Sequence, residues 1–184
     1  MEAIKLDQKY NYTDYCKWDD SKRWELIEGV PYAMAPAPSE SHHDCATGLF
    51  EILRSYLKGK TCKVFIAPFD VRLNPDSADD TVVQPDVFIV CDESKRDGKS
   101  INGAPDFIAE VLSPSSGRHD KLTKHKLYQN AGVKEYWIID PVDEIIAVNL
   151  LVNGKYEQSL YGEGEVPVSI LEGCIIDLDE IFGE

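Results

Sequence analysis

The sequence predicts an α/β fold of mixed α+β character, in which a mixed central sheet is flanked by helices. Strand-like apolar runs come before, between and after two helix-like segments. The two most apolar runs, at 87–91 and 107–112, are typical of central strands that are buried on both faces. The 184 residues fit one domain with its own core.

The first third of the chain predicts a short helix, a hairpin and a long helix. Residues 12–19 form the short helix, and the strand-like runs RWELIEG and VPYAMAP meet at Gly29 as a hairpin. The long helix is expected from Ser41, because Ser41 and Asp44 form a capping-box pattern and apolar residues then recur at helical spacing.

The middle of the chain predicts four strands and a second long helix. CKVFIA and FDVRL read as strands on either side of Pro68, and VVQPDVFIVC reads as a strongly apolar strand that is entered through Pro85. DFIAEVLS follows a polar loop and is the fourth strand. A helix is expected over 120–131, closed by Gly132.

The last part of the chain predicts an antiparallel extension. EYWIIDP is another apolar strand, and short strands follow it with a hairpin turn at Asn153–Gly154. A last helical turn is expected over 178–182. We therefore expect a single domain with a core over about 12–141 and a β extension over 142–184.

The composition excludes several classes of protein. Hydrophobic residues make up 43% and charged residues 28%, which argues against disordered, fibrous and disulfide-rich small proteins. No apolar run reaches the roughly 20 residues of a membrane helix, and the N-terminus carries charges where a signal peptide is apolar. We expect a cytoplasmic protein with no membrane partner. The 5 cysteines contain no CxxC pair, so neither zinc nor a disulfide framework is expected, and the thiols are predicted to be buried and reduced.

The charge is strongly acidic. Lys and Arg number 19 against 33 Asp and Glu, a net charge of −14. This argues against broad nucleic-acid binding, which needs a basic face. It leaves room for a small basic cleft on an acidic body, because the local field steers a ligand.

Two carboxylates lie where strand propensity alone does not place them. Asp86 follows Pro85 at the start of one apolar strand, and Glu110 lies inside the other. If these strands are neighbours, both carboxylates converge on one point and offer hard oxygen ligands for Mg²⁺. The alternatives are that Asp86 is a turn or edge residue, and that Glu110 faces solvent or pairs with an arginine such as Arg72.

The helix after the second apolar strand adds a third element. Asp120, Lys124 and Tyr128 follow each other at intervals of four and line one stripe. Lys124 on this stripe is placed to polarise a water beside Glu110. The alternative is a surface pair of Asp120 and Lys124.

Two further residues are weaker candidates. Glu25 shares a strand face with Ile27, so it points inward, toward a site, or to a salt bridge. His42 lies near the start of the long helix, where it either donates to a phosphate or has a structural role.

Four blocks together resemble the Uma-two family, whose members are described as restriction endonucleases of the PD-(D/E)xK nuclease superfamily. The blocks are WELIEGVPYAMAPAPSESHH, VVQPDVFIVC, APDFIAEVLSPSS and HDKLTKHKLYQNAGVKEYWIIDP. The resemblance covers about Tyr12 to Pro141 and implies a restriction-endonuclease-like core, with extra antiparallel strands at both ends of the chain.

The resemblance implies metal-dependent cleavage of DNA. Asp86 matches the aspartate of the motif and Glu110 its second acid, and the Val111 carbonyl completes a site for Mg²⁺ or Mn²⁺. Leu112 stands where the motif usually has lysine, and Lys124 on the following helix matches the displaced lysine.

The remaining matches extend the implied site. Glu25 matches the early acid and is expected to hold a second metal ion or an outer-sphere water. His42 matches the histidine of the N-terminal block, and Asp120 and Tyr128 share the stripe of Lys124; we expect these three residues to bind substrate. A homodimer suits an enzyme that cuts both strands of DNA.

Two other functions remain open at this point. One is an inactive module that keeps the nuclease fold for binding or assembly, which the charge of −14 and Leu112 favour. The other is a metal-dependent hydrolase of a small nucleotide, which suits an acidic exterior.

Overall fold

The computed structural model describes residues 4–5, 7–18, 22–34, 39–113 and 118–183, with the side chains of 118–121 left out. The strands form two mixed sheets and a small pair. The first sheet has the order β2 (Val30–Ala33), β1 (Trp24–Ile27), β5 (Val82–Val83), β4 (Asp70–Arg72), β7 (Ser100–Asn102). The second has the order β11 (Lys155–Tyr161), β10 (Ile145–Val152), β9 (Glu135–Asp140), β8 (Phe107–Val111), β6 (Val87–Val90), β3 (Lys63–Ile66). The pair is β12 (Glu165–Pro167) and β13 (Ile175–Asp177).

Four α-helices and one 3₁₀ turn lie in the described part of the chain. They are α1 (Tyr12–Tyr15), α2 (Glu40–Tyr56), the turn η1 (Glu93–Lys95), α3 (Arg118–Ala131) and α4 (Asp179–Phe182). Within the described residues, no helix is long and apolar enough to span a bilayer.

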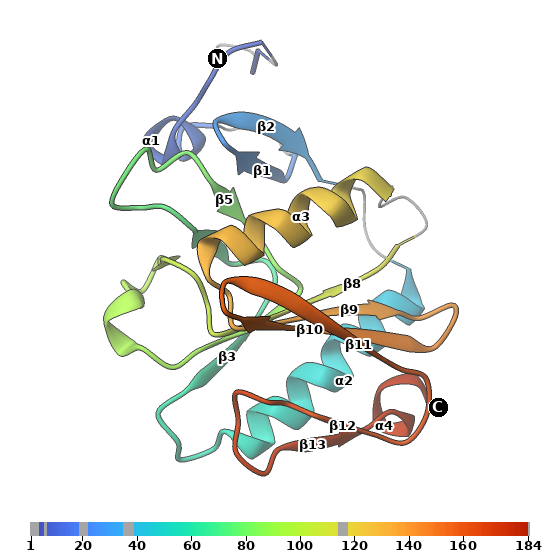
Figure 1. The fold of residues 1–184 in the computed structure, drawn as a ribbon. Coiled ribbons are helices and arrows are strands. Elements are labelled where there is room, and N and C mark those ends of the chain that lie inside the picture. Colours follow the sequence, from blue (N-terminus) through green and yellow to red (C-terminus); the bar gives the residue numbers. More distant parts are fainter. Residues whose placement is uncertain (1–3, 6, 19–21, 35–38, 114–117, 184) are drawn as a thin grey trace.

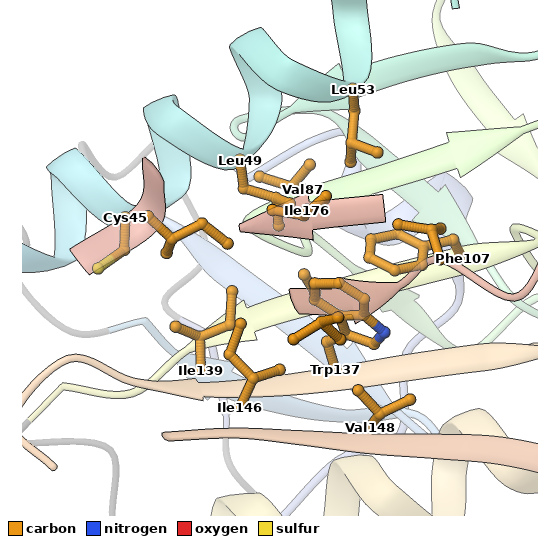
Figure 2. Close-up of a cluster of buried hydrophobic side chains, with 14 of the residues drawn as sticks. Cys45, Leu49, Leu53, Val87, Phe107, Trp137, Ile139, Ile146, Val148 and Ile176 are labelled. Atoms are coloured by element: carbon orange, nitrogen blue, oxygen red, sulfur yellow. The ribbon is translucent and has the colours of Figure 1, made fainter. Parts of the chain in front are cut away.

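The six-stranded sheet is covered on both faces. Alternate residues of β6 and β8 pack against α2 and the C-terminal strands, and this core contains Leu49, Phe107 and Trp137 (Figure 2). The other residues of the same strands pack against α3 and the five-stranded sheet, with Phe88 and Ile108 in that core. Figure 1 shows α3 next to β5 and α2 beside the C-terminal pair. The prediction that β6 and β8 are central is confirmed, because both lie inside the sheet.

Both predicted hairpin turns are present. Gly29 joins β1 to β2 with a φ of 78°, and Tyr32 lies opposite Glu25 in the ladder. Asn153 and Gly154 join β10 to β11 with φ values of 52° and 79°, the left-handed pair that a two-residue hairpin loop needs.

The predicted strand entered through Pro85 is confirmed as β6, but the two valines before Pro85 form a separate strand. The run divides into β5, which pairs with β1 and β4, and β6, which pairs with β3 and β8 in the other sheet. Proline has no N–H for a strand ladder, so the chain leaves one sheet there and enters the other. The break places Gln84 and Asp86 where the two sheets meet.

The start of the second helix also differs from the prediction. Its N-cap is Ser39, whose side chain accepts a hydrogen bond from the His42 N–H at 3.3 Å. Ser41 lies in the first turn, so the helix begins at Glu40. The two hydroxyls are 3.2 Å apart, and Ser39 is the one with the extended main chain that a cap requires.

The prediction of buried, reduced thiols holds for two cysteines and is wrong for three. Cys45 and Cys174 are buried and free, while Cys16 is exposed. Cys62 and Cys91 form a disulfide. They flank β3 and β6, whose register pairs Lys63 with Val90, so the next cross-strand position holds both cysteines.

A buried carboxylate connects β9 to the C-terminal extension. Glu135 is 0% exposed; it accepts hydrogen bonds from Trp137 Nε1 at 2.8 Å and from the Ile170 N–H at 3.0 Å. Burial raises the pKa of Glu135. The contact from Ile170 ties residues between β12 and β13 to the central sheet.

The variant Glu135→Ala is expected to lower the free energy of unfolding by about 2–4 kcal/mol, because it leaves the buried Trp137 Nε1–H and the half-buried Ile170 N–H without an acceptor and opens a cavity. Glu135→Gln keeps one acceptor oxygen and a similar volume, so its loss is expected to be clearly smaller. Urea unfolding of both variants measures the difference. Equal losses below about 0.5 kcal/mol would show that the carboxylate does not hold the extension.

Candidate active site

Asp86 and Glu110 lie on neighbouring strands. The antiparallel register pairs Val87 of β6 with Ala109 of β8, and one further step places Asp86 opposite Glu110. The main-chain N–H of Val111 donates a hydrogen bond to Asp86 Oδ2 at 2.9 Å. The break at Pro85 thus delivers one carboxylate to the edge of β6, beside the carboxylate that β8 carries in its interior.

Lys124 of α3 joins two carboxylates. Its Nζ lies 2.9 Å from Glu25 Oε1 and 3.0 Å from Glu110 Oε1. The side chains of Glu25, Glu110 and Lys124 are only 8%, 13% and 17% exposed, so solvent screens these contacts weakly. Side chains from β1, β8 and α3 therefore meet at one ammonium group, and Lys124 is not at the surface, as the alternative of a surface pair requires.

The ionisation of this cluster follows from burial and charge. Burial raises the pKa of Glu110 to about 7; the charge of Lys124 opposes this shift and the charges of Asp86 and Glu25 add to it. Burial by itself lowers the pKa of Lys124, but the charges of Glu110 and Glu25 outweigh it and raise that pKa. Lys124 therefore stays a cation at neutral pH.

Tyr128 lies one helical turn after Lys124. Its hydroxyl donates to Glu110 Oε1 at 2.6 Å, and its side chain is 0% exposed. The structure places Tyr128 behind Glu110, where it holds the carboxylate instead of facing a substrate. Burial raises the pKa of Tyr128 well above its ordinary value, so the hydroxyl keeps its proton.

His42 lies beside Asp86. Its Nε2 is 3.3 Å from Asp86 Oδ2, and the residue is 9% exposed. The hydrogen bond with Asp86 raises the pKa of His42 against the opposing effect of burial, with further contributions from the charges of Asp86 and Glu110 and from the Val111 main chain. The first turn of α2 thus places an imidazole at the carboxylate pair.

The sequence did not indicate Gln84 as part of the site. Its main-chain N–H donates to Glu25 Oε1 at 3.1 Å, and its side chain contacts Asp70 and Tyr15. The one available signal was its position directly before Pro85 and Asp86. Without knowledge of the β1–β5 pairing, that signal does not connect Gln84 to Glu25.

Two other sequence predictions concern Asp120 and Arg72. Asp120 lies in the first turn of α3, and its side chain falls outside the described residues. Arg72 makes a bidentate ion pair with Asp79, in which Nε lies 2.9 Å from Oδ1 and Nη2 lies 2.7 Å from Oδ2. The alternative of an Arg72–Glu110 pair therefore does not occur.

The oxygen atoms at the site suit a hard divalent cation. The contacts described above use Asp86 Oδ2 and Glu110 Oε1, and the second oxygen of each carboxylate has no hydrogen bond within the described residues. Among those residues, no group of three or more His, Cys, Asp or Glu side chains forms a complete metal cluster. Mg²⁺ is commonly held by one or two carboxylates and several waters, so this donor set fits it.

Comparisons with known proteins place the chain in a family. A family model described as "Putative restriction endonuclease" (Uma2) matches residues 12–179. An uncharacterized protein of Synechocystis sp. (slr1290) is 27% identical over 134 residues, which cover 71% of this chain and 68% of that protein.

A solved structure shares the fold. It is described as a "putative nuclease belonging to DUF820" from Anabaena variabilis, and it superposes with a TM-score of 0.76 at 19% identity. The match covers 94% of this chain and 97% of the other. It confirms the predicted fold class, a mixed α/β, nuclease-like fold.

Proposed function

Because the chain belongs to the Uma2 restriction endonuclease family, we propose that it is a metal-dependent endonuclease of PD-(D/E)xK type that hydrolyses phosphodiester bonds of DNA. The observation that carries this proposal is the contact of Lys124 with Glu25 and Glu110, next to Asp86. The motif lysine is missing from β8, where Leu112 follows the strand, and α3 supplies an ammonium group at the second acid instead.

Each residue has a role in this proposal. Asp86, Glu110 and the Val111 carbonyl would hold Mg²⁺ or Mn²⁺. When bound, such an ion activates water and stabilises negative charge on a phosphate. Lys124, held between two carboxylates, orients the attacking water and stabilises charge on the phosphate oxygens.

The surrounding residues keep this geometry in place. His42 holds Asp86 through Nε2, and Tyr128 holds Glu110 through its hydroxyl. Glu25 also contacts the ammonium group of Lys124 and positions it. Because these contacts exist before any substrate binds, little reorganisation is needed for catalysis.

A cleavage assay tests this function. We expect the wild-type protein to nick or linearise supercoiled plasmid with Mg²⁺ or Mn²⁺ and to be inactive with EDTA. The Glu110→Gln variant, prepared in the same way, is expected to show at least about 10³-fold less cleavage, because the lost metal ion supplies several kcal/mol to the transition state. Equal cleavage by both proteins would identify a contaminating nuclease and remove the proposal.

The same preparation separates the two alternative functions. If the protein is an inactive module, a calorimetric titration with Mn²⁺ is expected to show no heat of binding. If it is an endonuclease, the titration is expected to show a heat of binding that the Glu110→Gln variant lacks. If the protein is a nucleotide hydrolase, it is expected to release products from mononucleotides and to leave plasmid uncut. The homodimer and the cytoplasmic location stay predictions, and light scattering after size-exclusion chromatography measures the first of them.

A further inference from the structure

The candidate active site has little positive charge to offer a phosphodiester. Lys124 already contacts two carboxylates, Glu25 and Glu110, and Asp86 adds a third acid beside them. The whole chain carries a net charge of −14. Nucleic-acid binding depends on cations that neutralise backbone phosphates, so a further cation near the site is needed for the proposed function.

Gln84 connects this site to an arginine. Its main-chain N–H donates to Glu25 Oε1 at 3.1 Å, and its side-chain Oε1 accepts from Arg23 Nε at 3.1 Å and from Arg23 Nη2 at 2.8 Å. One residue therefore separates the guanidinium of Arg23 from the carboxylate that holds Lys124. Arg23 itself is exposed to solvent.

The amide of Gln84 is locked in the orientation that receives Arg23. Its Nε2 donates to Asp70 Oδ1 at 2.9 Å and to the Tyr15 hydroxyl at 3.1 Å. The hydroxyl of Tyr15 donates in turn to Asp70 Oδ1 at 3.1 Å. Since a carboxylate only accepts hydrogen bonds, the amide nitrogen faces Asp70 and the amide oxygen faces Arg23.

This arrangement orients a charge without neutralising it. Gln84 is a neutral partner, and it engages two of the five N–H donors of the guanidinium. A planar guanidinium that is held in this way matches the geometry of phosphate oxygens. The half-buried side chains of Tyr15, Asp70 and Gln84 thus present an exposed cation next to the candidate active site.

We propose that Arg23 binds a backbone phosphate of the nucleic acid beside the scissile phosphodiester, with Gln84 as the residue that positions it. This inference rests on the proposed function. It assigns Arg23 to binding of substrate, while the cleavage step stays with Asp86, Glu110 and Lys124.

Binding measured without cleavage tests the assignment. A fluorescent 20-base-pair duplex is titrated by anisotropy over a series of NaCl concentrations, with Ca²⁺ in place of Mg²⁺ and intact duplex verified on a gel. Arg23→Gln is expected to weaken binding roughly tenfold at low salt, the effect of one charge-assisted contact. The magnitude of the salt slope, log K against log [NaCl], is expected to fall by about 0.9.

Three further variants sharpen the result. Arg54→Gln makes the same charge change on the exposed face of α2, where Arg54 lies over the Phe50 ring, and is expected to match the wild type. Arg23→Lys is expected to keep the salt slope and to lose part of the affinity for duplex. The substitution keeps the positive charge but removes the paired N–H donors of the guanidinium. Gln84→Met is expected to raise KM for cleavage of duplex with kcat within about twofold, a split that a loss of folding does not produce.

The outcomes separate the two proposals. If the wild type binds duplex and Arg23→Gln matches Arg54→Gln in both affinity and salt slope, Arg23 is not a phosphate contact and the proposed function stands. A wild-type protein that does not bind the duplex overturns both. Thermal unfolding of each variant confirms that it is folded, and Arg23, as an exposed residue, is expected to tolerate the change.

Discussion

The variant Lys124→Met is expected to lose both stability and activity. It leaves Glu25 and Glu110 buried without the cation that both carboxylates contact, and the carboxylates then repel each other. Removing one partner of a buried ion pair lowers stability by about 3–5 kcal/mol. Cleavage is expected to fall by about 10²–10³-fold, the usual effect of removing one group that stabilises the transition state.

A double variant separates these two losses. The double variant Lys124→Met/Glu25→Gln removes one of the two buried carboxylate charges that the loss of Lys124 leaves without a partner. Urea unfolding is therefore expected to show that most of the lost free energy of unfolding returns. Cleavage of plasmid with Mg²⁺ is expected to stay at the level of the single variant. If the double variant regains activity together with stability, Lys124 has a structural role and no part in the chemistry.

The variant Asp86→Asn is expected to lose activity and to keep its fold. The amide oxygen still accepts the hydrogen bond that the Val111 N–H gives to Asp86, so the free energy of unfolding is expected to change by less than about 1 kcal/mol. The negative charge that a divalent cation needs is gone. Cleavage is expected to fall by about 10³-fold or more, because the ion supplies several kcal/mol to the transition state.

Asp106 provides a matched control at the other end of β8. Its carboxylate accepts from the Cys91 N–H at 2.8 Å and pairs with Lys134 Nζ at 2.6 Å, so it makes contacts of the same kind as Asp86. Asp106→Asn is expected to leave cleavage within about twofold of the wild type. A similar loss of activity in both variants would trace the effect to the sheet instead of to a metal site.

The sequence was sufficient where local chemistry determines the structure. The turn at Asn153–Gly154 needs two left-handed residues, and these two residue types adopt that conformation most easily. The apolar runs around Phe88 and Ile108 predicted strands that are buried on both faces, and both strands are central in the sheet. The spacing of Lys124 and Tyr128 correctly placed both residues on one side of a helix.

The sequence was insufficient where contacts join distant segments. The hydrogen bond from Gln84 to Glu25 spans 59 residues and depends on the pairing of β5 with β1. The Cys62–Cys91 disulfide depends on the register of β3 and β6 in the same way. In the run around Pro85, Gln84, Pro85 and Asp86 interrupt the apolar pattern, but this interruption alone did not reveal that the chain changes sheets there.

The position of Tyr128 illustrates a further limit. Its place on the stripe of Lys124 was predicted correctly, but the stripe does not reveal which residue faces solvent. That depends on how α3 lies over the six-stranded sheet. The core between α3 and the two larger sheets, which contains Phe88, Ile108 and Tyr136, determines this position. Tyr128 is packed among these residues, and only its hydroxyl reaches the carboxylate of Glu110.

The central claim is that Asp86 and Glu110 share one divalent ion with Lys124 beside it. Anomalous diffraction from crystals soaked in Mn²⁺ tests this most directly, with Asp86→Asn crystals soaked in parallel. We expect one strong peak within ligand distance of both carboxylates in the wild type and no peak there in the variant. A protein that cleaves DNA with Mn²⁺ while its anomalous peak lies away from either carboxylate would contradict the claim.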